Sequence, residues 1–305
     1  MFFGIDGGGT KTKAMLTDGD LNILAESMSG PSSIRTVSIE KSIANIKSCL
    51  DDCLRQYPDA DITSVFAGLG DVAGTEDGQM VASHLREIPA FNDAIITVKN
   101  DVYNAHAGAL DGESGIVIII GTGSVAFGVD EQGRSHRAGG YSYKEGDYSS
   151  AYGLGKQALS FVGKALDNRV PSTPLTDELI EKLNIQSFLD AVEVYDTYHT
   201  KRTDVAKLAK IVTKHAAKRD RNALAIIDYA TDELALMIKA IDVTLDLRNK
   251  VIGIIGSLGN ADTPLKEAFI QKVKAYDASY QLFRAKKDPV YGSCVLAGQG
   301  LTTKK

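Results

Sequence analysis

Short apolar runs alternate along the chain with longer segments that have a helical repeat. Near the N-terminus, the segments FFGI, TKAMLT and ILAES are apolar or alternating and are separated by turn-forming residues, which predicts three strands joined by tight turns. From residue 38 to 57 apolar residues recur every three or four positions, with Ser38 as a possible cap and Pro58 directly after. This segment is therefore predicted to be a helix. Similar patterns predict strands at 62–70 and 94–100 and helices at 76–88 and 101–110.

The same plan begins again after the sequence DGES at residues 111–114. An apolar strand, the turn GTGS, a second strand, the turn DEQG and a third strand follow in that order. The remainder is predicted to contain helices at 148–166, 177–183, 204–219, 222–247, 265–275 and 291–301, with strands at 251–260 and in QLFRA. We therefore expect an α/β protein with two domains, 1–112 and 113–305, whose last helix could pack back on the first domain.

Composition limits the classes of partner. The net charge of -5 comes without a concentrated basic segment, which argues against nucleic acid as a ligand. The longest apolar run, Ile116 to Ile120, is too short to span a bilayer, and the N-terminus lacks the pattern of a signal peptide. Cys49 and Cys53 share one face of the first predicted helix and form no CxxC motif with each other or with Cys294. Buried thiols in a reducing compartment are expected, so we expect a cytoplasmic protein.

The stretch GIDGGGTKT, residues 4–12, is glycine-rich in the manner of a phosphate-binding loop. A P-loop needs its lysine directly after glycine and a helix thereafter, whereas Thr10 intervenes here and a strand follows. A dinucleotide fingerprint also needs a helix after its glycines. The remaining interpretation is a tight hairpin whose tip is formed by Gly7, Gly8 and Gly9.

Such a tip could bind an anion, because glycine permits positive φ and unobstructed N–H groups. Thr10 would add a hydroxyl donor. The negative charge of Asp6 beside an anion is explained if Mg²⁺ lies between them. The alternative is an ordinary glycine turn with an aspartate facing solvent. The second glycine turn at 121–124, placed equivalently in the second half, favours a pair of hairpins that bind a polyphosphate.

Six segments occur in the order typical of one family: DGGGTKT, ND at 100–101, GTGS, GGY with GDYSSAYGLG, VIGIIGSLGN and DPVYGSCVLAG. In these segments the chain resembles the BadF/BadG and N-acetylglucosamine kinase family of the actin-like ATPase superfamily. The resemblance implies two actin-like (ribonuclease H-like) domains with a nucleotide cleft between them, and ATP and Mg²⁺ as cofactors. It assigns phosphate and nucleotide contacts to Gly7, Gly8, Gly9, Thr10, Gly121, Thr122, Gly123, Ser124, Gly256 and Gly259, and the metal to Asp6.

Asp101 is the candidate catalytic residue. It follows a predicted strand and begins a helix, so it should lie at the carboxyl edge of a sheet, where open α/β folds bind ligands. A carboxylate there could accept the proton of an attacking sugar hydroxyl. An aspartate at this position could also simply cap the helix.

By resemblance, the sugar is contacted by Ser33, Asp101, Gly139, Gly140 and Asp147. Asp147 could instead be a helix cap. The chain departs from the family pattern at two places that concern the sugar. Gly146-Asp147-Tyr148-Ser149-Ser150 stands where relatives read roughly G-D-E-G-S, and Ser33 aligns with an asparagine.

The leading functional hypothesis is an ATP-dependent kinase of an amino sugar: N-acetylglucosamine, glucosamine or a compound like N-acetylmuramic acid. One alternative within the family is an ATPase that activates a dehydratase and holds an iron–sulfur cluster through cysteines. Another is a non-catalytic sensor of sugar or nucleotide. The expected partners are therefore ATP, ADP and a small sugar, without nucleic acid or membrane. A homodimer is common among relatives, although no feature of this sequence demonstrates one.

Overall fold

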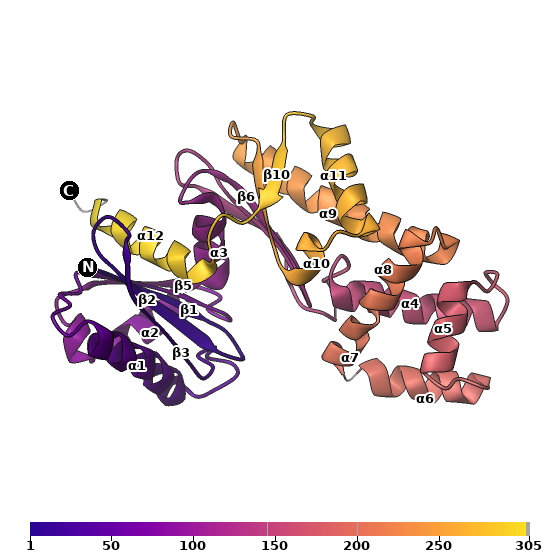
Figure 1. Cartoon of the computed structure of the whole chain (residues 1–305), viewed down its shortest axis with the longest axis horizontal. Coiled ribbons are helices and arrows are strands. Elements are labelled where there is room, and N and C mark those ends of the chain that lie inside the picture. Colours follow the sequence, from indigo (N-terminus) through magenta and orange to yellow (C-terminus); the bar gives the residue numbers. More distant parts are fainter. Residues whose placement is uncertain (145, 200, 303–305) are drawn as a thin grey trace. The chain divides into compact units, whose positions relative to one another are not determined.

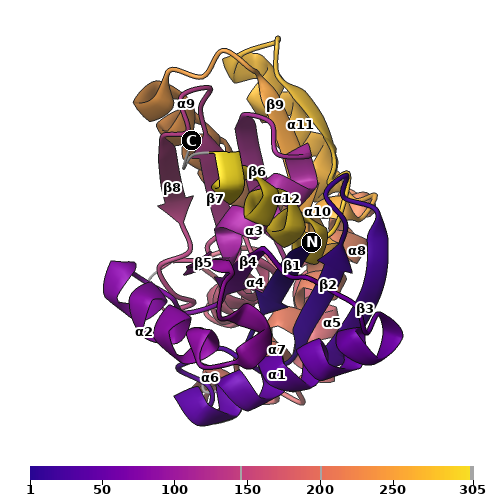
Figure 2. The ribbon, with the colours of Figure 1, turned by 90° about the vertical axis from the view of Figure 1, so that its left-hand side faces the viewer.

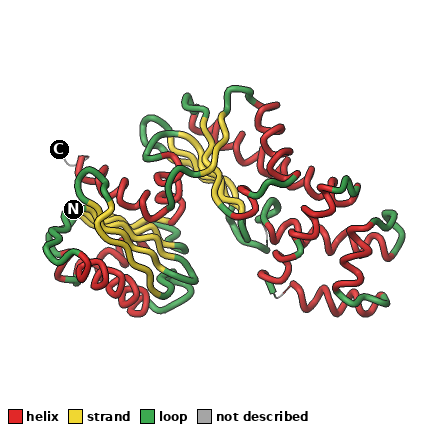
Figure 3. The backbone as a smooth tube through the Cα atoms, in the orientation of Figure 1, coloured by secondary structure: helices red, strands yellow, loops and turns green. Residues whose placement is uncertain are grey.

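Two five-stranded sheets, each with its own helices, make up the structure (Figures 1 and 3). The computed structural model describes residues 1–144, 146–199 and 201–302. Its first unit comprises residues 1–114 together with the segment from residue 285 onward, and its second unit comprises residues 115–284.

The sheet of the first unit has the strand order β3-β2-β1-β4-β5. Its first three strands are antiparallel neighbours, whereas β4 and β5 run parallel to β1. This follows from the connections: tight turns join β1, β2 and β3, and helices precede β4 and β5. The strands are β1 (Phe2–Gly7), β2 (Thr12–Thr17), β3 (Ile23–Ser29), β4 (Ser64–Leu69) and β5 (Ile95–Asn100).

Helices cover both faces of this sheet. The ribbon in Figures 1 and 2 shows α1 and α2 on one face and α3 and α12 on the other. Ser38 caps α1 as predicted, since its side chain accepts a hydrogen bond from the Lys41 amide. The helical segments of this unit are α1 (Ile39–Gln56), α2 (Thr75–Arg86), the 3₁₀ turn η1 (Pro89–Phe91), α3 (Asp101–Leu110) and α12 (Pro289–Thr302).

The last helix groups with the first unit, although it lies within the range 113–305 expected for the second domain; its packing on the first domain had been allowed for in the sequence prediction. Two glycines allow α12 to lie against α3: a Cβ on Gly292 would lie 2.1 Å from the Asn104 carbonyl oxygen, and one on Gly108 2.3 Å from the Asp288 carbonyl oxygen. The Ser293 hydroxyl also donates to the Ile5 carbonyl at 2.9 Å. Backbone approach at these glycines and burial of the helix against β1 and β4 therefore fix α12 to the first unit.

The second unit repeats the plan of the first. Its sheet has the order β10-β9-β6-β7-β8, with antiparallel β6, β7 and β8 and with β9 and β10 parallel to β6. The strands are β6 (Gly115–Ile120), β7 (Ser124–Val129), β8 (Ser135–Gly139), β9 (Val251–Ile255) and β10 (Gln281–Arg284). The helices are α4 (Ala151–Leu166), α5 (Pro174–Lys182), α6 (Phe188–His199), α7 (Arg202–Lys207), α8 (Ala209–Ala217), α9 (Arg221–Leu245), α10 (Ser257–Asn260) and α11 (Pro264–Tyr276).

Three elements of the second unit differ from the sequence prediction. The single helix expected at 204–219 is two helices, α7 and α8. The strand expected at 251–260 ends at Ile255, because Gly256 has φ +100° and the chain turns there into α10. Helix α6 was not predicted; its Phe188 and Leu189 are 78% and 69% exposed, so its first turn does not show the buried stripe on which a helix prediction depends.

The three cysteines are free and buried, as predicted. Burial raises the pKa of the Cys49 thiol to about 11 and those of Cys53 and Cys294 to about 12. Within the described ranges, no helix has the length and apolarity needed to cross a membrane.

Candidate active site

The first glycine hairpin joins β1 to β2 and is tightly closed. The Gly8 amide donates to the Lys11 carbonyl at 3.0 Å. None of Gly7, Gly8 and Gly9 has a positive φ, so their expected use of the left-handed region is wrong. Gly7 and Gly9 are required for space, because a Cβ on Gly7 would lie 2.1 Å from the Ser32 hydroxyl oxygen and one on Gly9 3.1 Å from the Thr36 hydroxyl oxygen. A Cβ on Gly8 would make only an ordinary contact, 3.9 Å from the Lys11 carbonyl oxygen.

Asp6 lies near the end of β1, where its carboxylate is held by Asn104 of α3. The Asn104 amide nitrogen donates to Asp6 Oδ1 at 2.9 Å, and Gly68 leaves room for that side chain, because a Cβ there would lie 1.8 Å from Asn104 Oδ1. Burial raises the pKa of Asp6 to about 6; the hydrogen bond from Asn104 opposes this effect, and the charges of Asp101 and Asp288 add to it. Asn104 Oδ1 itself is buried with no hydrogen-bond partner among the described residues.

Asp101 lies at the carboxyl edge of the sheet, as predicted. Asn100 ends β5 and caps α3 by accepting from the Val102 amide at 3.3 Å, so the alternative in which Asp101 caps the helix is wrong. The Asp101 carboxylate is near Gly70, where a Cβ would lie 3.5 Å from Asp101 Oδ2 and 3.6 Å from the Gly7 carbonyl oxygen. The first unit therefore brings Asp101 and the glycine hairpin together beside Gly70.

Ser33 lies behind this hairpin. It is 1% exposed, and its amide donates to the Gly8 carbonyl at 3.2 Å. Its hydroxyl donates to the carboxylate of Asp71 and accepts from the hydroxyl of Thr36. These contacts link the hairpin to the loop that follows β4.

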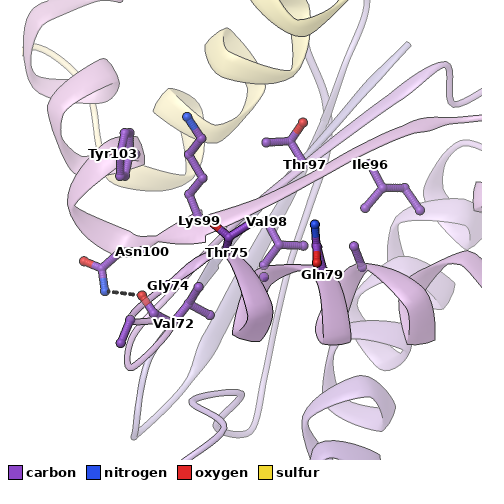
Figure 4. Close-up of a pocket in the computed structure, with 13 residues that line it drawn as sticks. Val72, Gly74, Thr75, Gln79, Ile96, Thr97, Val98, Lys99, Asn100 and Tyr103 are labelled. Atoms are coloured by element: carbon purple, nitrogen blue, oxygen red, sulfur yellow. Dashed lines mark hydrogen bonds between the residues drawn. The ribbon is translucent and has the colours of Figure 1, made fainter. Parts of the chain in front are cut away.

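A hollow of about 410 Å³ lies between α2 and β5 in the first unit (Figure 4). Asn100 and Val72 at its edge are joined by a 3.1 Å hydrogen bond from the Asn100 amide nitrogen to the Val72 carbonyl. The Lys99 ammonium lies 4.5 Å from the centre of the Tyr103 ring. None of the site residues predicted from the sequence lines this hollow.

The second glycine hairpin, GTGS at 121–124, is fixed to the start of α4. The Gly121 amide donates to the Gly123 carbonyl at 2.9 Å, and the Ala151 amide donates to the Gly121 carbonyl at 2.8 Å. A hollow of about 310 Å³ opens beside it and brings together residues from the hairpin, α7, α8 and α10. Its lining is Gly121, Thr122, Ala151, Thr203, Ala206, Lys207, Ala209, Lys210, Thr213, Ser257, Leu258, Ala261 and Thr263.

Gly256 and Gly259 lie next to this hollow without lining it. A Cβ on Gly256 would lie 2.3 Å from the Ile120 carbonyl oxygen, and one on Gly259 would lie 2.9 Å from a methyl carbon of Ile254. The two glycines thus allow α10 to pack closely on β6 and β9. That packing places Ser257 and Leu258 in the lining.

The carboxylate of Asp147 is hydrogen-bonded to the second hairpin. Its Oδ1 accepts from the Ser124 amide at 2.9 Å, and its Oδ2 lies 3.2 Å from Nη2 of Arg202. Ser150, not Asp147, caps α4, by accepting from the Gly153 amide at 3.1 Å; the alternative in which Asp147 is the cap is therefore wrong.

A third hollow, of about 210 Å³, lies in the second unit beside Asp147. Gly139, at the end of β8, lines it and has φ +76°, and the adjacent Gly140 has φ +71°. Glycine is favoured at both because other residues are strained in this region. The full lining is Ser124, Gly139, Tyr141, Gly146, Asp147, Tyr148, Ser149, Glu233 and Met237.

Sequence reasoning missed three side chains near the predicted residues. Asn104 had a detectable signal, since it follows Asp101 by three positions and so shares its face of α3. Arg202 and Glu233 had none, because they come from α7 and α9 and reach the hairpin region only through the tertiary fold.

Two α/β units of equivalent strand order, each with a glycine hairpin between its first two strands, form the two-domain architecture of actin-like sugar kinases. The chain belongs to the BadF/BadG/BcrA/BcrD ATPase family, whose model matches residues 3–297.

Its relatives are similar over almost their whole length. An N-acetylmuramic acid/N-acetylglucosamine kinase of Clostridium acetobutylicum is 28% identical over 299 residues, covering 96% of this chain and 97% of that protein. An N-acetyl-D-glucosamine kinase of Dictyostelium discoideum is 28% identical over 320 residues, covering 100% and 99%. A crystal structure of a candidate N-acetylglucosamine kinase from Chromobacterium violaceum has a TM-score of 0.70 and 25% identity, with 98% of both chains covered.

Proposed function

We propose that this protein is an ATP-dependent kinase that transfers the γ-phosphoryl group to a hydroxyl of an amino sugar. The observation that carries the proposal is the position of the Asp101 carboxylate beside Gly70 and the Gly7 carbonyl at the carboxyl edge of the first sheet. A base candidate and a phosphate-loop candidate are thereby adjacent in one unit. The activities named for the two kinase relatives agree with this chemistry.

Phosphate contacts are proposed for the glycine hairpin of each unit. In the first unit, Gly7, Gly8, Gly9 and the Thr10 hydroxyl are the proposed contacts of the outer phosphates. In the second unit, residues 121–124 are the proposed contacts of the remaining phosphates. The hollow of about 310 Å³ is of a size and composition suited to adenosine, with Leu258 and several alanines for the base and threonine hydroxyls for the ribose. Lys210 in its lining is a cation available to phosphate, whereas Lys207, also in the lining, forms an ion pair with Asp204 at 2.7 Å.

Magnesium fits the environment of Asp6. Among the residues that the structure describes, no three histidine, cysteine or acidic side chains cluster as a metal site. However, Mg²⁺ in such enzymes is usually held by one or two carboxylates together with phosphate oxygens and water. The buried, unpartnered Asn104 Oδ1 is suited to accept a hydrogen bond from a metal-bound water. Mg²⁺ held by Asp6 would neutralise charge on the phosphates.

Asp101 is proposed as the general base. The sugar hydroxyl oxygen attacks the γ-phosphorus, the bond from that phosphorus to the bridging oxygen of ADP breaks, and Asp101 accepts the hydroxyl proton. Most of the rate is expected from positioning and charge neutralisation, since phosphoryl transfer needs little covalent assistance. Ser33, Gly139, Gly140 and Asp147 remain proposed sugar contacts.

The test is sugar-dependent ADP release with Mg-ATP and a panel of hexosamines. Wild type should show turnover that depends on the sugar, and Asp101→Asn should lower kcat by about 10²–10⁴-fold, the usual contribution of a general base. Asp93→Asn, an exposed aspartate before β5, is the charge-matched control and should retain activity. If no sugar raises ADP release, the kinase proposal fails; if Asp101→Asn keeps the full rate, only the base assignment fails.

ATP as donor agrees with the cytoplasmic location expected from the sequence. A small sugar and ATP are the proposed partners, without nucleic acid or membrane. A homodimer is also proposed, because α9 presents Tyr229, Leu236 and Val243 at seven-residue intervals, and these are 39%, 57% and 71% exposed. Sedimentation of wild type and of Leu236→Glu would test that assembly, since the charge should shift a dimer to monomer.

A further inference from the structure

The hollow of about 210 Å³ beside Asp147 is built from polar side chains with unused hydrogen-bonding capacity. Ser124 is 3% exposed and Ser149 is fully buried. Neither hydroxyl has a hydrogen-bond partner among the described residues, although both residues line the hollow. A buried hydroxyl without a partner is energetically unfavourable, because it has lost its hydrogen bonds to water. Two of them in one small hollow indicate a site at which a polar ligand supplies the missing partners.

The charges around this hollow do not cancel. The negative charge of Asp147 is compensated by the Ser124 amide at 2.9 Å and by the Arg202 guanidinium at 3.2 Å. The Arg202 guanidinium also lies over the ring of Tyr143, 5.3 Å from its centre, and this contact helps to hold it beside Asp147. The second carboxylate of the lining is that of Glu233, from α9.

Glu233 is half-buried, and no described residue donates a hydrogen bond to it or forms an ion pair with it. The nearby titratable groups, Tyr148 and Tyr229, are phenols whose rings pack edge to face with centres 6.3 Å apart. The described part of the lining therefore has one uncompensated negative charge. Met237 forms an apolar side of the hollow, with its sulfur 2.5 Å from where a Cβ on Gly139 would lie.

We propose that this hollow binds the amino-bearing side of the sugar and that Glu233 pairs with a protonated amino group. The preferred substrate is then a hexosamine with a free amino group rather than an N-acylated one. This inference rests on the proposed kinase function and specifies its substrate class. An ammonium donates to Glu233 and compensates its charge, whereas an amide leaves that charge uncompensated and a lactyl carboxylate is repelled by it.

The hydroxyl of Ser149 binds a sugar hydroxyl in the same site, while Ser124, which also lines the hollow, belongs to the hairpin proposed for phosphate. A site whose buried polar groups are completed by one substrate discriminates strongly against an analogue that leaves them unpaired. Glu233 is consequently a specificity-determining residue, and its effect should depend on the substituent at the sugar nitrogen.

The experiment compares kcat/KM for glucosamine, N-acetylglucosamine and N-acetylmuramic acid in wild type, Glu233→Gln and Glu233→Asp. Glu233→Gln should lower kcat/KM for glucosamine at least about tenfold, mainly through KM, because a charged hydrogen bond is lost. The values for the two N-acetyl sugars should stay within about twofold or rise. Glu233→Asp should restore part of the preference. Glu193→Gln, an exposed glutamate on α6, controls for the change of net charge.

The outcomes separate the inference from the function on which it rests. Turnover of N-acetylglucosamine with an unchanged substrate ratio in Glu233→Gln overturns the role of Glu233 and leaves the kinase standing. Wild-type preference for an N-acetyl sugar over glucosamine overturns the substrate class. If wild type shows no sugar-dependent ADP release with any of the three, the kinase proposal itself has failed. Thermal unfolding of each variant shows whether a loss of activity reflects loss of the fold.

Discussion

Replacement of Asp6 by asparagine should abolish kinase activity and, at the same time, stabilise the ligand-free protein. Asp6 is positioned to hold a cation, but without one its carboxylate is buried beside the charges of Asp101 and Asp288. The asparagine oxygen can still accept the 2.9 Å hydrogen bond from Asn104, so the substitution removes the charge while it keeps the contact. Function and stability should therefore change in opposite directions.

The magnitude follows from the pKa of Asp6, which burial raises from 3.8 to about 6. The native state then binds the Asp6 proton more tightly than the unfolded state, so ionisation of Asp6 destabilises the native state. Its unfavourable contribution is absent below about pH 4, grows between pH 4 and pH 6, and is complete above pH 6. Each pH unit between the two pKa values corresponds to about 1.4 kcal/mol, which gives an upper value of about 3 kcal/mol at neutral pH.

Calorimetric unfolding of wild type and Asp6→Asn, with chelator and without nucleotide, provides the assay. At about pH 7.5 the variant should unfold at a higher temperature, by about 2–4 °C per kcal/mol for a domain of this size, and the difference should vanish near pH 4. Asp59→Asn, an exposed aspartate in the first unit, controls for net charge. A variant no more stable than wild type at pH 7.5, or an equal gain at both pH values, would refute the argument.

Two further predictions concern buried groups elsewhere. Arg202→Met should lower the free energy of unfolding of the second unit by about 1–3 kcal/mol in urea titrations, because the side chain of Asp147 is 5% exposed and loses its ion-pair partner. Arg202→Lys should lower the free energy of unfolding by less. Equal decreases in the two variants would count against the ion pair. A thiol-reactive dye at about pH 8 should label the cysteines of the native protein negligibly, because the thiolate is the reactive form and the raised pKa values keep the thiols protonated. After unfolding, the dye should label all of the cysteines. Rapid labelling of the native protein would contradict the raised pKa values. The thiols concerned are Cys49, Cys53 and Cys294.

Periodicity and turn chemistry predicted the local structure well where one residue decides the outcome. Ser38 caps α1, and Asp101 lies at the end of the parallel strand β5. The first was predictable because the cap directly precedes its helix, and the second because β5 and α3 follow one another directly in the sequence. The glycines of the first hairpin were predicted to matter, but for a different reason: a Cβ on Gly7 would collide with Ser32, and a contact 25 residues away in sequence is not visible in a local pattern.

The misses share a physical cause. Gly256 adopts φ +100° and ends β9, but a glycine in an apolar run is equally compatible with a strand that continues. The docking of α12 on the first unit was anticipated, but the backbone contact between Gly108 and Gly292 on which it depends was not, because these glycines are 184 residues apart. Tertiary contacts decided these features, and no helical or strand repeat encodes them.

The residues proposed to bind the sugar also come together only in the tertiary fold. The hollow takes Ser124 from a hairpin, Asp147 and Ser149 from the segment before α4, and Glu233 from the middle of α9. The hairpin is fixed by backbone hydrogen bonds, and α4 is capped by the Ser150 hydroxyl. Glu233 makes no hydrogen bond or ion pair with the described residues, so its replacement should alter the charge of the hollow without disturbing the fold. Substrate choice could then change by one substitution on α9 while both glycine hairpins stay the same, and for that reason the motifs that identify the family do not identify the sugar.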